Sequence, residues 1–176
     1  MTDGRKCLSR NGKESGALLL SELYAAAPGS GNILNNPIYH KEHTMDPRIE
    51  KFLSSQAFGV AGASTNREKY GNKVLRCYLA NGKKAIPINP RADKIEGVPC
   101  VAGVADLPPD VKSLSVITPP KITETVVDEA IGKGVENVWM QPGAESPAAV
   151  EKCRKAGINV IADGSCLLVV LGYREH

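Results

Sequence analysis

The stretch Ala57-Phe58-Gly59-Val60-Ala61-Gly62-Ala63-Ser64, AFGVAGAS, decides the fold. Its first five residues contain no polar side chain, which is typical of a strand buried on both faces, and its last three form a small-residue turn. Residues 74–79 then carry apolar side chains at helical spacing, and Asn81-Gly82 is typical of a helix end. A second apolar strand is expected at 84–88, ended by Asn89-Pro90. A strand, a helix and a strand in this order predict two parallel strands joined by a crossover helix.

The same alternation continues to the end of the chain. We expect a short strand at 98–101 and main strands at 114–117, 137–140 and 158–162. Further helices are expected from Asp46-Pro47, near 104–107, over 122–131 and from Ser146-Pro147, where Ser and Asp caps precede proline. In the helix over 122–131 the predicted buried face consists of Ile122, Val126, Val127, Ala130 and Ile131. The fold class is therefore α/β: a single doubly wound Rossmann-like domain with a mainly parallel sheet of about five strands and right-handed crossovers.

Length and composition restrict the class of protein further. The chain has 176 residues, of which 42% are hydrophobic, so it suits one globular domain with some excess and does not suit a disordered chain. No apolar run reaches the length of about 20 residues that a membrane helix needs, so we expect a soluble protein without a membrane partner. The net charge of +3 arises from 22 basic and 19 acidic residues scattered along the chain, and aromatic residues make up only 5%. Nucleic acid is therefore not an expected partner.

Cysteine and histidine usage indicate the compartment and exclude some sites. The five cysteines are widely spaced and form no Cys-x-x-Cys pair, which favours reduced thiols in the cytoplasm. The three histidines, His40, His43 and His176, lie near the ends of the chain, so neither a metal site nor a catalytic triad is expected.

The chain divides into two parts by composition. Residues 1–44 are rich in Gly, Ser and Asn and are expected to form a flexible N-terminal extension, whereas residues 45–176 form the folded domain. A role of the extension in binding a partner protein stays open as a separate hypothesis. The number of subunits also stays open, and a homo-oligomer is compatible with the sequence.

Ligands of open parallel sheets lie beyond the carboxyl ends of the strands, so the residues after each apolar run carry the chemistry. After the first strand, residues 62–71 combine a small-residue turn, a polar loop with Arg67 and Lys69, and a helix start. Such a loop suits a phosphate group, because backbone N–H groups and the helix dipole both favour an anion. The alternative is a tight connection whose glycines only permit close packing. The loop matches neither the Gly-x-Gly-x-x-Gly nor the Walker A pattern, so kinase or ATPase activity is not supported.

The second strand ends in Asn89-Pro90-Arg91, where an NAD-dependent dehydrogenase commonly carries an acidic residue. Arginine at this position favours a phosphorylated ribose, as in NADP or the 3'-phospho-ADP part of coenzyme A (CoA). Alternatively, Asn89-Pro90 only ends the strand and Arg91 is solvated. Thr118-Pro119-Pro120 suits a rigid wall of a ligand cleft, and Gln141-Pro142-Gly143 offers an amide that can donate and accept.

Groups for acid-base catalysis are scarce at these strand ends. They hold mainly Asn, Thr, Gln, Pro and Gly, and the one acid there, Asp163, precedes Gly164 as a turn former commonly does. Cys166 could be a reactive thiol near the crevice or an inert buried one. The sequence indicates a place to bind a ligand and shows no evident catalytic machinery.

In combination, several short strings resemble one family. They are Val60-Ala61-Gly62-Ala63-Ser64, Lys69-Tyr70-Gly71, Ile88-Asn89-Pro90-Arg91, Leu107-Pro108, Val138-Trp139-Met140-Gln141-Pro142-Gly143 and Ala156-Gly157. In order and spacing these strings resemble the small stand-alone CoA-binding domain proteins over residues 46–173. Those proteins are Rossmann-like relatives of the CoA-binding domain of the succinyl-CoA synthetase alpha subunit.

The resemblance implies roles for particular residues. The CoA phosphates would be held by Gly62, Ala63, Ser64, Thr65, Lys69, Tyr70 and Gly71; the nucleotide would lie against Asn89, Pro90 and Arg91; Thr118 and Pro119 would line the adenine or pantetheine side; and Gln141, Pro142 and Gly143 would close the cleft. Many members carry Arg where Ser165 precedes Cys166, and the phosphorylated histidine of the synthetase has no counterpart. The expected function is non-catalytic binding of CoA or an acyl-CoA; the alternative is an NADP-linked oxidoreductase on the same scaffold.

Overall fold

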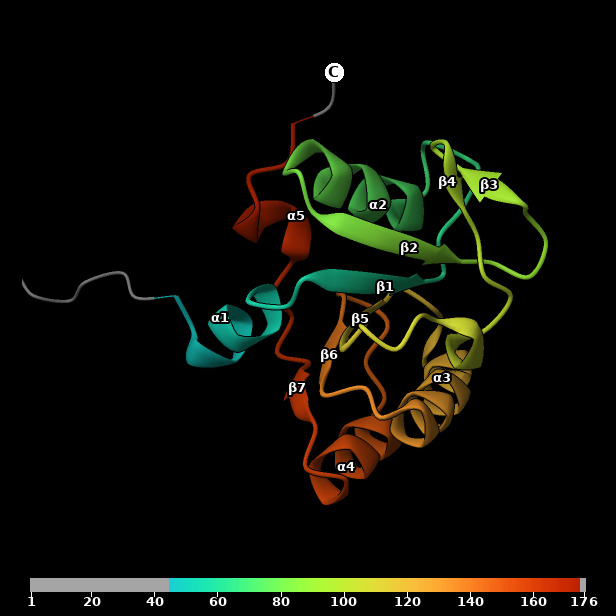
Figure 1. Ribbon diagram of the computed structural model, residues 1–176. Helices are drawn as coiled ribbons and strands as arrows, with labels where there is room; N and C mark the ends of the chain where they lie inside the picture. Colours follow the sequence, from blue (N-terminus) through green and yellow to red (C-terminus); the bar gives the residue numbers. More distant parts are fainter. Residues whose placement is uncertain (1–44, 175–176) are drawn as a thin grey trace, which may run out of the picture. The chain divides into compact units, whose positions relative to one another are not determined.

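A five-stranded parallel sheet forms the centre of the domain (Figure 1). The computed structural model describes residues 45–174, so the expected extension at 1–44 lies outside the described residues. The strands are β1 (Ala57–Ala61), β2 (Lys84–Ile88), β5 (Ser113–Val116), β6 (Asn137–Met140) and β7 (Asn159–Ile161), in the spatial order β2-β1-β5-β6-β7. The order reverses between β1 and β5, which confirms the doubly wound Rossmann-like fold.

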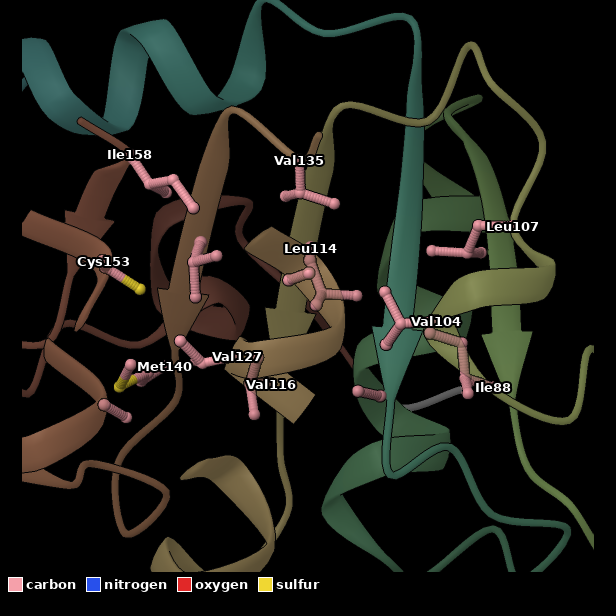
Figure 2. Packing of buried hydrophobic residues seen from close by; sticks show 14 of the residues in the cluster. Ile88, Val104, Leu107, Leu114, Val116, Val127, Val135, Met140, Cys153 and Ile158 are labelled. Carbon is pink, nitrogen blue, oxygen red and sulfur yellow. The ribbon is translucent and has the colours of Figure 1, made fainter. Parts of the chain in front are cut away.

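Helices cover both faces of this sheet. The helices are α1 (Pro47–Leu53), α2 (Tyr70–Ala80), α3 (Pro120–Lys133), α4 (Pro147–Lys155) and α5 (Leu167–Val170), with a 3-10 turn, η2, at Val104–Asp106. On one face, α1, α2 and α5 pack around the aromatic side chains of Phe52, Phe58, Tyr78 and Trp139. On the other face, η2, α3 and α4 pack against aliphatic side chains of the strands, including Leu114, Val116 and Met140 (Figure 2).

Two predicted helix starts are confirmed by their capping bonds. The Asp46 carboxylate accepts from the Arg48 N–H ahead of α1, and the Ser146 hydroxyl accepts from the Ala149 N–H ahead of α4. In each helix a proline follows at the first position, where no backbone donor is needed. Among residues 45–174, no helix is long and apolar enough to span a bilayer.

Two expectations need correction. The short strand expected at 98–101 is β4 (Val98–Pro99), which pairs antiparallel with β3 (Lys94–Ile95) in a separate two-stranded sheet, because Gly97 at φ +79° closes a tight hairpin. The predicted buried face of the helix over 122–131 is also shifted. The buried side of α3 is Thr123, Val127 and Ala130, whereas Ile122 is 52% exposed. Ile122 lies one position off this stripe and so faces away from the sheet.

Candidate functional site

A cleft lies at the carboxyl ends of β1, β2 and β5, where the strand order reverses. Its volume is about 550 Å³. The cleft is lined by Ala61, Gly62, Ala63, Lys69, Ile88, Asn89, Pro90, Arg91, Ala102, Gly103, Val104, Thr118, Ile122, Val126 and Glu129. Helix α3 and η2 thus form one wall, and the loop after β1 forms another.

Gly62 and Gly71 shape the loop between β1 and α2. Gly62 is exposed with φ +92°, and a Cβ there would stand 3.2 Å from the Ile117 carbonyl carbon and 3.3 Å from the Thr118 main-chain nitrogen. The main chain at Gly62 therefore borders the cleft uncovered by a side chain. Gly71 is buried, and its Cα packs directly on the Gly62 carbonyl. Gly71 therefore has the role of a glycine that permits close packing: it lets α2 approach the main chain of the loop at Gly62 and Ala63.

Polar side chains organise the loop itself. The Asn66 N–H donates to the Ser64 hydroxyl at 3.1 Å, and the Glu68 N–H donates to the Asn66 amide oxygen at 2.9 Å. Helix α2 then begins after Lys69, which caps it without a side-chain hydrogen bond. Main-chain N–H groups in the first turn of a helix lack partners within that helix, so this end of α2 favours an anion.

Two asparagines tie the strand ends together. The Asn89 amide nitrogen donates to the Ala63 carbonyl at 2.9 Å, while its oxygen accepts from the Arg91 N–H at 2.8 Å. Asn72 is fully buried, and its amide nitrogen donates to the Ser64 carbonyl at 2.8 Å. Asn89 therefore holds the loop after β1 against the loop after β2. Asn72, which the sequence reasoning missed, holds the loop after β1 against α2.

The charged side chains of the cleft are two cations and one carboxylate, all on exposed residues. Lys69 comes from the loop after β1, Arg91 from the loop after β2, and Glu129 from α3. The Glu129 carboxylate accepts from the Val104 N–H at 3.2 Å and so links α3 to η2. The cations lie on the strand side of the cleft and suit phosphate groups, which arginine and lysine commonly bind.

A second group of polar side chains lies at the end of β6. The Gln141 side chain is fully buried, and its oxygen accepts from the Leu167 N–H at 2.9 Å and from the Tyr70 hydroxyl at 3.4 Å. The Tyr70 hydroxyl also lies 2.6 Å from the Cys166 sulfur. Burial, followed by this contact with Cys166, raises the pKa of Tyr70. The phenol is therefore neutral at ordinary pH.

Asp163 ties β7 to α1. Its carboxylate accepts from the Ser165 N–H at 3.1 Å and forms an ion pair with Arg48 at 2.6 Å. Hydrogen bonds from Ser165, together with Arg48, lower the pKa of Asp163. The bond from the N–H of Ser165, two residues further along, is typical of an aspartate that stabilises a turn.

The structure brings only part of the predicted set to the cleft. Gly62, Ala63, Lys69, Asn89, Pro90, Arg91 and Thr118 line it, whereas Ser64, Thr65, Tyr70, Gly71, Pro119, Gln141, Pro142 and Gly143 do not. Sequence reasoning missed residues 102–104 and the α3 wall of Ile122, Val126 and Glu129. Residues 102–104 reach the cleft because Val101 forms a parallel bridge with Ile88 at the end of β2. No sequence signal marked that bridge.

The lining of the cleft offers two kinds of group. Exposed glycine main chain, a helix N-terminus and two cations suit phosphates, and the aliphatic side chains of Ile88, Ile122 and Val126 suit a flat base. Residues 45–174 contain no histidine, and no three Cys, Asp or Glu side chains in this part of the chain are grouped for a metal ion.

Residues 56–171 match the family described as CoA binding domain. The chain belongs to this family. This CoA-binding domain is also similar to curated acetate-CoA ligases (ADP-forming). It is 29% identical to ligase II of Archaeoglobus fulgidus over 126 residues, covering 65% of this chain and 19% of the ligase. It is 28% identical to the ligase II alpha subunit of Pyrococcus furiosus, covering 51% of this chain and 20% of that subunit. The CoA-binding domain thus spans about a fifth of the length of these relatives.

Solved structures share the fold of this CoA-binding domain. A conserved hypothetical protein of Pyrococcus furiosus is 38% identical, with a TM-score of 0.63, and the match covers 65% of this chain and 98% of that protein. The dinucleotide-forming acetyl-coenzyme A synthetase 1 of Candidatus Korarchaeum cryptofilum, in complex with phosphate and ADP, is 26% identical with a TM-score of 0.57. That match covers 66% of this chain and 27% of the synthetase.

Proposed function

We propose that the protein binds CoA or an acyl-CoA in the cleft over β1, β2 and β5, without a catalytic step of its own. The observation that carries this proposal is the meeting of the Gly62 main chain, Lys69 and Arg91 at one cleft in a member of the CoA-binding domain family. Lys69 and the start of α2 would bind the pyrophosphate, and Arg91 would pair with the 3'-phosphate. Asn89 would hold the two loops in place through its bond to Ala63.

The remaining predicted residues would act at the edges of this site. Ser64, Thr65, Tyr70 and Gly71 would shape the phosphate loop, Pro119 would stiffen the wall beside Thr118, and Gln141, Pro142 and Gly143 would contact the far end of the ligand. The cleft lining offers Glu129 as its only carboxylate, and this group is bonded to the Val104 N–H. That arrangement supports binding rather than acid-base chemistry.

The proposal extends to partners and compartment. We place the protein in the cytoplasm because the four cysteines within residues 45–174 are free thiols. Its ligand is a small molecule rather than nucleic acid or a membrane, and association into a homo-oligomer is compatible with the proposal. The family match and the similar ligases give no support to NADP as the ligand, so NADP is included only as a competing ligand in the experiment.

The test is calorimetry of the full chain with CoA, dephospho-CoA, NADP and NAD. CoA is expected to bind, and binding of NADP but not CoA would overturn the proposal. Arg91→Ala should weaken CoA by about tenfold or more, because a charge-assisted hydrogen bond contributes about 1.5–3 kcal/mol. The same change should leave dephospho-CoA nearly unaffected. Arg154→Ala, an exposed position on α4 outside the cleft, is the matched control and should alter neither ligand. Equal weakening of both ligands by Arg91→Ala would show that Arg91 does not bind the 3'-phosphate.

A further inference from the structure

A buried donor without a partner lies at the carboxyl end of β6. The Gln141 side-chain oxygen accepts from the Leu167 N–H at 2.9 Å, and a backbone N–H can only donate, so this bond fixes which end of the amide is oxygen. The amide nitrogen is therefore the other end. This nitrogen is buried and has no hydrogen-bond partner among the described residues. Buried donors of this kind are rare in folded proteins, because leaving one unpaired is costly.

Two features connect this amide with the cleft: the contact with Tyr70 and the order of the strands. Tyr70 and Cys166 are half-buried, and the Tyr70 hydroxyl lies 3.4 Å from the Gln141 oxygen and 2.6 Å from the Cys166 sulfur. Tyr70 directly follows Lys69, which lines the cleft. In the sheet, β5 lies between β1 and β6. Thr118, which lines the cleft, follows shortly after the end of β5. A ligand whose phosphates lie at the start of α2 would therefore extend its pantetheine arm along this edge toward Gln141.

We propose that Gln141 binds the carbonyl oxygen of an acyl thioester, so that the preferred ligand is an acyl-CoA rather than free CoA. The inference rests on the proposed function and narrows its ligand. The unpaired amide nitrogen is a donor only, a thioester carbonyl is an acceptor for it, and a free thiol is a weak one. The half-buried side chains of Tyr70 and Cys166, which contact each other beside Gln141, would turn aside as the acyl end enters. Pairing with the carbonyl would satisfy the donor that the chain itself leaves unpaired.

The experiment compares three ligands on the full chain by calorimetry: CoA, acetyl-CoA and S-ethyl-CoA. S-ethyl-CoA is a thioether that keeps the size of the acetyl group but lacks its carbonyl. Acetyl-CoA should bind about tenfold more tightly than S-ethyl-CoA, the effect of one buried hydrogen bond. Gln141→Met removes the amide donor, and it removes the acceptor for the Leu167 N–H in all three complexes alike, so the difference between acetyl-CoA and S-ethyl-CoA should disappear. Gln56→Met is the matched control, because Gln56 is exposed and directly precedes β1, at the amino end of the strands, whereas Gln141 follows the carboxyl end of β6.

Each outcome decides the proposal. Equal affinity of the wild-type chain for acetyl-CoA and S-ethyl-CoA would overturn it, and this comparison needs no variant that folds poorly. A difference that persists in Gln141→Met would also overturn it, since another donor would then bind the carbonyl. If Gln141→Met weakened CoA as much as acetyl-CoA, the proposal would also be overturned, because the amide would then contact a pantetheine carbonyl instead. Failure of all three ligands to bind is a different result, because it would overturn the proposed function itself.

Discussion

Replacing Gly71 with alanine tests whether close packing behind the phosphate loop sets the shape of the cleft. A Cβ on residue 71 would stand 2.9 Å from the Gly62 carbonyl carbon and 3.2 Å from the Ala63 Cα, and closer still to the Gly62 carbonyl oxygen. These are backbone atoms, so no side chain can rotate away and the loop has to move. Overpacking of this kind costs about 1–3 kcal/mol, and alanine regains about 0.5–1 kcal/mol by its helix propensity. We expect a net loss of about 1–2 kcal/mol.

The assays are urea unfolding, thermal unfolding and calorimetric titration with CoA. The loss of stability should lower the melting temperature by about 4 °C for each kcal/mol, and displacement of Gly62 from the cleft should weaken CoA by about tenfold. Gly132→Ala is the control, since this glycine lies within α3 and an added Cβ would meet nothing within 4 Å. Gly132→Ala should leave stability unchanged or raise it by about 0.5 kcal/mol. If Gly71→Ala unfolded at the wild-type urea concentration and bound CoA normally, the packing argument would be wrong.

Two further predictions concern the core. The Tyr78 hydroxyl lies 2.7 Å from the Ser115 hydroxyl, both buried, so Tyr78→Phe should lower the free energy of unfolding by about 1–3 kcal/mol, whereas adding Ser115→Ala should restore much of it. Additive losses in urea unfolding would contradict this pairing. Burial raises the pKa values of Cys77 and Cys153 from 9.0 to about 11. Between about pH 9 and pH 11 the folded chain therefore binds more protons than the unfolded chain, so its stability falls as the pH rises. The urea midpoint should be constant from pH 7 to about pH 8 and should decrease from about pH 9 to pH 11. A midpoint that rises or stays constant up to pH 11 would refute this.

The candidate site was predicted in part. Gly62 and Arg91 could be named from sequence because Gly62 directly follows β1 and Arg91 lies in the turn after β2, and strand ends gather at one edge of a parallel sheet. Gln141 also follows a strand, yet its side chain turns inward toward Leu167 instead of into the cleft. Gly103 and Glu129 were not predicted, because Gly103 precedes η2 and Glu129 lies in α3, and neither follows the end of a strand of the parallel sheet.

By itself, the sequence determined the five strands of the parallel sheet, most of the helices between them, and their order; it did not predict β3 or α5. Apolar runs, proline-started helices and glycine ends are local signals, and β1, β2 and β6 fall at the predicted residues because backbone propensity and burial pattern act over a few positions. Only the tertiary structure decided which residues share a surface. The contact of Gly71 with Gly62, the bond from Asn89 to Ala63 and the unpaired amide of Gln141 join segments far apart in sequence or depend on how a side chain turns. Such contacts follow from packing in three dimensions, which no local pattern encodes.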